Sequence, residues 1–152
     1  MPNTYSKIYL QFIFAVQNRQ SVIKKEWRDQ LYKYIAGIIQ NNGHKLLAIN
    51  GIPDHIHIFL GYNEQQPVPK LMQDVKGWSS KWINSNNFIN GKFIWQEGYG
   101  VFSYSHSQID RVVKYILHQE QHHKQRTFQK EYIYFLNKFN VQYDKRYILK
   151  DV

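Results

Sequence analysis

The feature that most constrains this chain is an alternating segment that contains two histidines, Asp54-His55-Ile56-His57-Ile58-Phe59-Leu60. Alternation with a period of two is typical of a β-strand, whose successive side chains point to opposite faces of a sheet. Ile56, Ile58 and Leu60 therefore share one face, and the two histidines share the other with Phe59. Imidazoles placed in this way can offer a metal ion two neutral nitrogen ligands. A solvated strand face with two histidines and no ligand is the alternative for this pattern alone.

The flanking segments predict further strands and helices. Residues 6–16 alternate and residues 45–52 form an apolar run, so both are predicted strands, and the turn at Pro53 joins the second of them to the histidine strand as a hairpin. Apolar residues at helical spacing predict one helix from Trp27 to Ile38 and another from Val68 to Trp82. Residues 93–105, rich in aromatics and broken by glycines, predict one strand or two short ones with a kink.

The resulting order is strand, helix, strand, strand, helix, strand, which is the split βαβ pattern of ferredoxin-like and RRM-like α+β folds. We expect an antiparallel sheet with the two helices on one face, and Trp78 and Trp82 packed in the core between them. The histidine face is predicted to be open, because Ile56, Ile58 and Leu60 should turn toward the helices. RNA-recognition domains bind nucleic acid on such an open face. No linker or repeat is visible, so residues 1–152 are predicted to form a single domain with its core at about 5–105.

A third helix is predicted from about residue 108 to 121 and a fourth from about 127 to 139. At roughly 100° per residue, the third helix has one apolar face, and its polar, chemically active residues gather on the other side. That second group comprises Tyr115, His118, Gln119 and His122. A polar, solvated helix face that carries an incidental tyrosine is the alternative.

Strand and helix together predict a site for phosphodiester chemistry. His55 and His57 supply two ligands and Gln119 can supply a third, a set without thiolate that suits Mg²⁺ or Mn²⁺ when a phosphate oxygen completes the shell. Such an ion polarises a phosphodiester and offsets charge in the transition state. Tyr115 would then attack, helped by the metal or a nearby base because a phenol has a pKa near 10. The protein would become joined to DNA through a phosphotyrosine, and a second strand end could reverse the step.

Charge and composition point to a nucleic-acid partner. The formal net charge is +9 and aromatic residues make up 16% of the chain, which suits a polyanion whose bases can stack; a basic protein with its aromatics in the core is the alternative. A generic solvated charge is the favoured interpretation of each basic residue, and phosphate contact is the alternative; the candidates are Lys70, Lys76, Lys81, Arg111 and Lys114.

The cysteine content and the length of the apolar runs limit the cellular compartments in which the protein is expected. The absence of cysteine excludes disulfides and thiolate zinc sites. No signal peptide or run of roughly 20 apolar residues occurs, so we expect a cytoplasmic protein with no membrane partner.

Three stretches carry a resemblance to a known family. Asp54-His55-Ile56-His57 resembles the His-hydrophobe-His motif of HUH endonucleases. Tyr115-Ile116-Leu117-His118-Gln119 resembles the Tyr-x-x-x-Gln helix of the tyrosine transposases of small bacterial insertion sequences, and residues 95–103 resemble the aromatic-glycine strand that precedes that helix. The similarity in order and spacing spans about residues 5 to 140.

The resemblance implies a ferredoxin-like core and an obligate homodimer in which the tyrosine helix of one subunit can complete the other's site. It implies metal-dependent cutting and rejoining of single-stranded DNA at hairpin-marked element ends through a 5′-phosphotyrosine. His55, His57 and Gln119 carry over as ligands and Tyr115 as the nucleophile. His118 could replace Gln119 as third ligand, and Asp54 could orient a ligand histidine.

Two other functions remain open from the sequence. One is a domesticated relative that binds hairpin DNA or RNA without cutting it. The other is a small metal-dependent hydrolase that uses an activated water in place of Tyr115. The fourth helix is expected to serve only packing or dimerisation.

Overall fold

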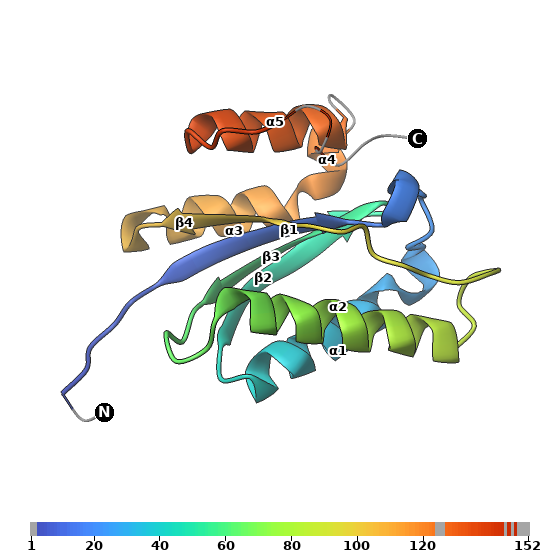
Figure 1. The fold of residues 1–152 in the computed structure, drawn as a ribbon, viewed down its shortest axis with the longest axis horizontal. Helices are drawn as coiled ribbons and strands as arrows, with labels where there is room; N and C mark the ends of the chain where they lie inside the picture. Colours follow the sequence, from blue (N-terminus) through green and yellow to red (C-terminus); the bar gives the residue numbers. More distant parts are fainter. Residues whose placement is uncertain (1–2, 124–126, 145, 147, 149–152) are drawn as a thin grey trace.

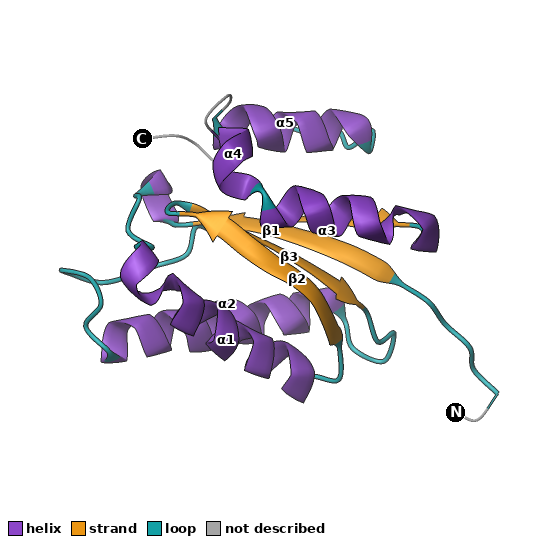
Figure 2. Ribbon diagram, turned by 180° about the vertical axis from the view of Figure 1, so that it is seen from behind, coloured by secondary structure: helices purple, strands orange, loops and turns teal. Residues whose placement is uncertain are grey.

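The computed structural model describes residues 3–123, 127–144, 146 and 148. It consists of a central sheet with helices on both faces (Figures 1 and 2). Helices α1 and α2 cover one face, and α3, α4 and α5 lie on the other. The elements are β1 (Tyr9–Ala15), η1 (Gln17–Arg19), α1 (Lys25–Asn41), β2 (Lys45–Ile52), β3 (His55–Gly61), α2 (Val68–Ser85), β4 (Gly100–Tyr104), η2 (His106–Gln108), α3 (Ile109–Leu117), α4 (Gln119–His123) and α5 (Phe128–Lys138).

The sheet has four strands in the order β2-β3-β1-β4, and all three neighbouring pairs are antiparallel. This is the arrangement of the split βαβ fold, so the predicted ferredoxin-like α+β class is confirmed. The register places His57 opposite Ile13 on β1 and opposite Asn50 on β2. The histidine strand is therefore central, and its backbone is held from both sides.

The larger core lies between the sheet and helices α1 and α2, as the alternation predicts. Ile56, Ile58 and Leu60 on β3 are buried there against the apolar stripes of the two helices. The prediction that Trp78 joins this core is wrong, because its side chain is 52% exposed. The side chains of α2 that face the core include Val75 and Ser79, which are four residues apart. The Ser79 hydroxyl accepts a hydrogen bond from Trp95 Nε1 at 2.9 Å. Trp78 is rotated away from these side chains, whereas Trp82 packs at the margin of the core.

The prediction of an open histidine face is also wrong. Ala48 and Phe59 pack with Val112 and Ile116 of α3, and Ile13 belongs to a second cluster that also contains residues of α5. The members of that second cluster on α5 are Phe128, Tyr132, Phe135 and Leu136. The apolar residues interspersed on this sheet face and the amphipathic character of α3 and α5 explain the cover, because both surfaces lose contact with water when they pack together.

The tyrosine helix is interrupted where a continuous helix to residue 121 was predicted. Helix α3 ends at Leu117, and His118 has φ −107° and ψ 29°, outside the helical region. Gln119 then begins the short helix α4. Helix α5 begins after Thr127, whose hydroxyl accepts a hydrogen bond from the Lys130 backbone amide. Among the described residues, no helix combines the length and apolar character required to cross a bilayer.

Candidate active site

Two imidazoles of β3 form the base of the site. Both His55 and His57 are fully buried, and their ring centroids are 5.1 Å apart. The carboxylate of Asp54 lies 2.8 Å from His55 Nδ1, and the amide of Gln11 on β1 lies 2.9 Å from His57 Nδ1. Because each Nδ1 has its own partner, both Nε2 atoms are left to face the space between the sheet and α5. Asp54 thus occupies the orienting position that the sequence suggested, whereas Gln11 was not predicted.

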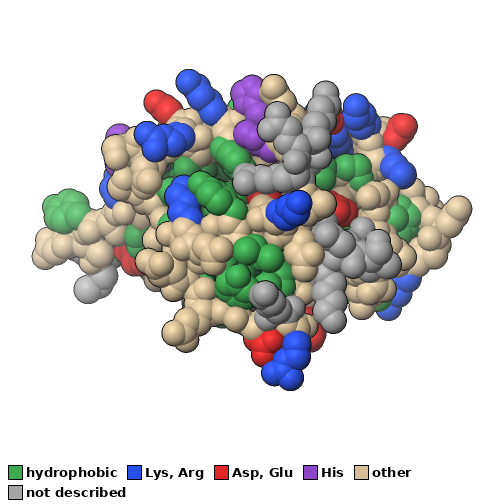
Figure 3. All heavy atoms as spheres, turned by 90° about the horizontal axis from the view of Figure 1, so that it is seen from above, with side chains coloured by type: hydrophobic (Ala, Val, Ile, Leu, Met, Phe, Trp, Pro, Cys, Tyr) green, Lys and Arg blue, Asp and Glu red, His purple; other side chains and the backbone are tan. Residues whose placement is uncertain are grey.

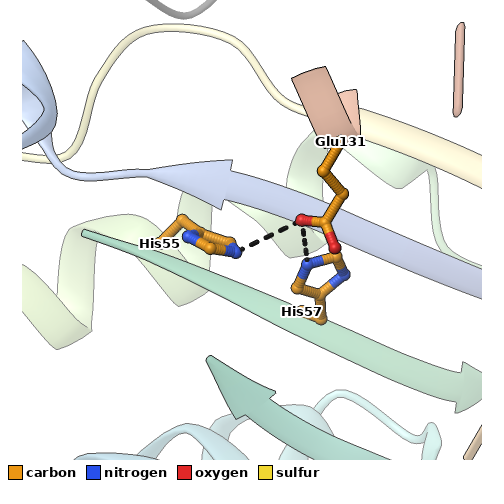
Figure 4. Close-up of side chains that lie close together, drawn as sticks. All are labelled: His55, His57 and Glu131. Atoms are coloured by element: carbon orange, nitrogen blue, oxygen red, sulfur yellow. Dashed lines mark hydrogen bonds and ion pairs between the residues drawn. The ribbon is translucent and has the colours of Figure 1, made fainter. Parts of the chain in front are cut away.

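A carboxylate that the sequence reasoning missed lies directly between the two Nε2 atoms (Figure 4). Glu131 Oε1, from α5, is 3.0 Å from His57 Nε2 and 3.4 Å from His55 Nε2. Its side chain is fully buried. The position of Glu131 in the sequence could have indicated its role, because it lies within the apolar stripe formed by Phe128, Tyr132 and Phe135. A buried acidic residue is costly unless it is paired.

Gln119 also reaches this cluster. Its side chain is fully buried, its Oε1 is 3.3 Å from His55 Nε2, and its Nε2 is 3.4 Å from Glu131 Oε2. His118, the alternative ligand, is exposed and its Nδ1 bonds to the Lys114 carbonyl. The break after α3 therefore directs Gln119, and not His118, toward the histidine pair.

Tyr115 approaches the cluster from α3. Its hydroxyl donates a hydrogen bond to Glu131 Oε2, and its ring lies 6.1 Å from the His57 ring between centroids. His122 of α4 stacks on the Tyr115 ring, with centroids 4.3 Å apart. Tyrosine, imidazoles, amide and carboxylate thus meet within one chain.

The donor atoms suit a divalent cation. His55, His57 and Glu131 each offer a ligand atom, and the three atoms lie within 4.8 Å of one another. Neighbouring ligands of an octahedral ion with bonds of about 2.1 Å are about 3.0 Å apart, close to the distances of 3.0 and 3.4 Å from Glu131 Oε1 to the two imidazole Nε2 atoms. Nitrogen and oxygen donors without sulfur are compatible with Mg²⁺ or Mn²⁺.

The local charges also affect His55. Burial alone would lower the pKa of His55, but the carboxylates of Asp54 and Glu131 outweigh burial and raise it above its usual value. The carboxylates beside His55 therefore favour positive charge at this buried position.

A pocket of about 310 Å³ opens beside Tyr115, between α3 and α5. Arg111 and Lys138 line it, together with the aromatic side chains of Tyr104 and Tyr134. Figure 3 views the molecule from the α5 side, where the Lys and Arg side chains of the described residues are spread around hydrophobic patches. The pocket thus combines positive charge with aromatic rings beside Tyr115, whose side chain is partly buried.

The predicted phosphate contacts fall into two groups. Arg111 and Lys114 are exposed on α3, on the same side of the sheet as the histidines. The three lysines of α2 lie on the other side: Lys70 pairs with Asp74 at 2.9 Å, and Lys81 lies over the Trp78 ring. Lys76 donates to the carbonyls of residues 96 and 98, and burial lowers its pKa to about 8.

The fold and the site define a class of protein: a ferredoxin-like domain in which two histidines on a central strand face a tyrosine from a later helix. Residues 4–119 match the family described as Transposase IS200 like. The chain belongs to this family of DNA transposases, as its resemblance to HUH-type tyrosine transposases predicted.

Individual relatives agree with this assignment. Over 118 residues the chain is 26% identical to the ISDra2 transposase TnpA of Deinococcus radiodurans. The matched region covers 74% of this chain and 83% of the relative. It is also similar to the crystal structure of a candidate transposase from Deinococcus radiodurans R1, with a TM-score of 0.61 and 26% identity over 77% of this chain and 94% of the other. A REP-associated tyrosine transposase bound to a REP hairpin has a TM-score of 0.58 over 76% of this chain and 68% of its own, and at 16% identity it shows the fold alone.

Proposed function

We propose that this transposase cuts and rejoins single-stranded DNA at hairpin-marked element ends, with Tyr115 as the nucleophile. The observation that carries the proposal is the position of the Tyr115 hydroxyl at a buried cluster of metal-capable side chains. His55, His57 and Gln119 are the proposed ligands of Mg²⁺ or Mn²⁺. A bound ion would supply Lewis-acid polarisation of the scissile phosphate.

The chemistry is an exchange of one phosphodiester for another. The Tyr115 oxygen bonds to phosphorus, the bond from phosphorus to the 3′-oxygen breaks, and that oxygen leaves as a hydroxyl after it gains a proton. The product is a 5′-phosphotyrosine and a free 3′-hydroxyl end. Because the number of phosphodiesters is unchanged, attack by a second 3′-hydroxyl regenerates Tyr115 and joins two strands. Asp54 and Gln11 hold the imidazoles in orientation.

The pocket beside Tyr115 supports a path for the DNA strand. Arg111 and Lys138 can contact phosphates, and Tyr134 offers an exposed ring for a base. Lys114 extends the same positive side of α3. Lys70 and Lys81 are proposed to contact the hairpin at a distance from the chemistry, whereas Lys76 already donates to two carbonyls and is the weakest candidate.

A homodimer is the proposed assembly, on the basis of the resemblance to transposases that exchange their tyrosine helices. The contact between Tyr115 and Glu131 within one chain supports a site that a single subunit can also assemble. Light scattering of the purified protein, alone and with hairpin DNA, tests the assembly.

The test of the function follows both ends of the DNA. The full chain is incubated with Mg²⁺ and a hairpin oligonucleotide labelled at its 3′ end, or with the same DNA labelled at its 5′ end, and the products are separated on a denaturing gel. We expect a labelled protein band from the first DNA and a shortened free strand from the second. Tyr115→Phe should lose both, while Tyr34→Phe, on α1 beyond the opposite sheet face, should retain them.

Each alternative gives a different gel. A mobility shift without any cleavage would indicate a non-cleaving hairpin-binding protein and refute the proposal. Cleavage that persists in Tyr115→Phe without a protein-bound label would indicate hydrolysis by water.

A further inference from the structure

The most unusual group of the site is the carboxylate of Glu131, because it lies beyond the region that matches the family, residues 4–119. We propose that Glu131 is both a ligand of the divalent ion and the proton acceptor for Tyr115, so that helix α5 completes the active site of its own chain. The inference rests on the proposed function and adds a catalytic residue to it.

The packing of α5 fixes the carboxylate in place. Phe128 lies one turn before Glu131, and its ring contacts the His55 ring, with centroids 4.3 Å apart. Phe135 follows one turn later and lies 5.7 Å from the Tyr115 ring. Both anchors are buried, so the Glu131 side chain is held between them over the histidine pair.

Burial makes a purely structural role for this glutamate unfavourable. A charged carboxylate at a fully buried position of an apolar stripe is costly unless other groups compensate for it, and a leucine would fill the same place without that cost. Among the groups that compensate for the charge of Glu131 are His55, His57, Gln119 and Tyr115. These four belong to the proposed catalytic set.

The two oxygens of Glu131 face different partners. Oε1 lies 3.0 and 3.4 Å from the two imidazole Nε2 atoms, the separations expected between neighbouring ligands of one ion. Oε2 accepts the hydrogen bond of the Tyr115 hydroxyl. One carboxylate can therefore hold the ion through Oε1 while Oε2 orients the phenol.

The same geometry accounts for the proton in the strand-transfer step. As the Tyr115 oxygen bonds to phosphorus, its proton moves to Glu131 Oε2. The 3′-oxygen leaves on the side of phosphorus opposite to Tyr115, so it gains its proton from solvent water, and Glu131 releases the proton that it accepted to water. Glu131 ends the step as a carboxylate, and no reactant other than water is needed.

The test measures binding of Mn²⁺ to the full metal-free chain without DNA, by the loss of the free-ion signal in electron paramagnetic resonance. We expect Glu131→Gln to weaken binding by at least about 10-fold, because even the loss of a group that only orients a ligand costs about 10- to 100-fold. The matched control is Glu120→Gln, an exposed glutamate next to Gln119 that pairs with Arg28, and it should bind within about twofold of wild type. Mn²⁺ binding by Glu131→Gln that equals or exceeds that of wild type would overturn the inference, since the carboxylate would then be a bystander or a competitor.

Two additions make the outcome decisive. If Glu131→Gln does not unfold cooperatively, Glu131→Asp replaces it. The Asp variant keeps the charge but shortens the side chain, and undiminished Mn²⁺ binding by this variant would refute direct ligation.

Adduct formation on hairpin DNA is measured in parallel. A wild-type protein that binds Mn²⁺ through Glu131 but forms no adduct refutes the proposed function alone, whereas an adduct formed as well by Glu131→Gln refutes the inference alone.

Discussion

Replacement of Gln11 by leucine should weaken metal binding although Gln11 touches no proposed ligand atom. Gln11 is fully buried on β1, where its amide lies 2.9 Å from His57 Nδ1 and accepts a 2.7 Å hydrogen bond from the Tyr104 hydroxyl. A histidine that binds a metal through Nε2 carries its proton on Nδ1 and needs an acceptor there. The Gln11 amide can present its oxygen to that proton by rotation about its last bond, while the Tyr104 hydroxyl accepts from the amide nitrogen.

The structure sets the expected magnitudes for Gln11→Leu. Loss of such a supporting contact weakens metal binding by about 10- to 100-fold, or about 1.4–2.8 kcal/mol. The buried Nδ1 of His57 also loses its partner, which should lower the free energy of unfolding by about 1–3 kcal/mol. The Tyr104 hydroxyl is only partly buried and can bond to water, so it should add little.

Two measurements separate these effects: Mn²⁺ titration by electron paramagnetic resonance for the metal, and urea unfolding of the metal-free protein for stability. Gln11→Glu is the informative comparison, because its carboxylate can accept the Nδ1 proton and should restore binding to near the wild-type level. Gln11→Leu that binds Mn²⁺ within twofold of wild type while folded would refute the reasoning. Equal losses in the Leu and Glu variants would assign Gln11 a packing role only.

Two other predictions test the surface. The double variant Arg111→Ala and Lys138→Ala should weaken binding of single-stranded DNA, as measured by fluorescence anisotropy. Because each phosphate contact contributes about 0.7 to the slope of log K against log salt, the magnitude of that slope should fall by about 1.4. The control Lys33→Ala on α1 should leave the slope unchanged, and an unchanged slope in the double variant would exclude the pocket as a DNA path. Trp78→Ala should lower the free energy of urea unfolding by less than Trp82→Ala does, because the Trp78 side chain is 52% exposed whereas Trp82 packs at the edge of the core. Equal losses in the two variants would contradict this distinction.

The alternating pattern predicted the central part of the site because strand geometry is local. A period of two places His55 and His57 on one face whatever packs against them. The order of strands and helices then restricted the chain to the observed sheet, in which β3 is central. Tyr115 and Gln119 were also identified, although the helix that was expected to join them is broken at His118. Both side chains nevertheless contact Glu131, so the prediction of their proximity did not depend on one continuous helix.

The cover over the histidine face could not be predicted because it depends on contacts between distant segments. Alternation shows which residues share a face, but it does not show how many layers cover that face. The interpretation as an open face followed from counting only the two helices of the βαβ core. Phe59 on that face, and Ile13 opposite His57, were signs that water is excluded there.

The same omission explains why Glu131 was missed. The apolar stripe of α5 accounts for the helix without Glu131, because each of its turns has a large apolar side chain. If the histidine face were open, an acid on α5 would have no reason to be buried. Once α5 covers that face, the carboxylate must meet the imidazoles or remain uncompensated, and its interactions with both Nε2 atoms follow from the closed layer. The buried acid and the covered sheet face are therefore one structural fact, and a charged residue on an apolar helix stripe is the sequence signal that could have predicted both.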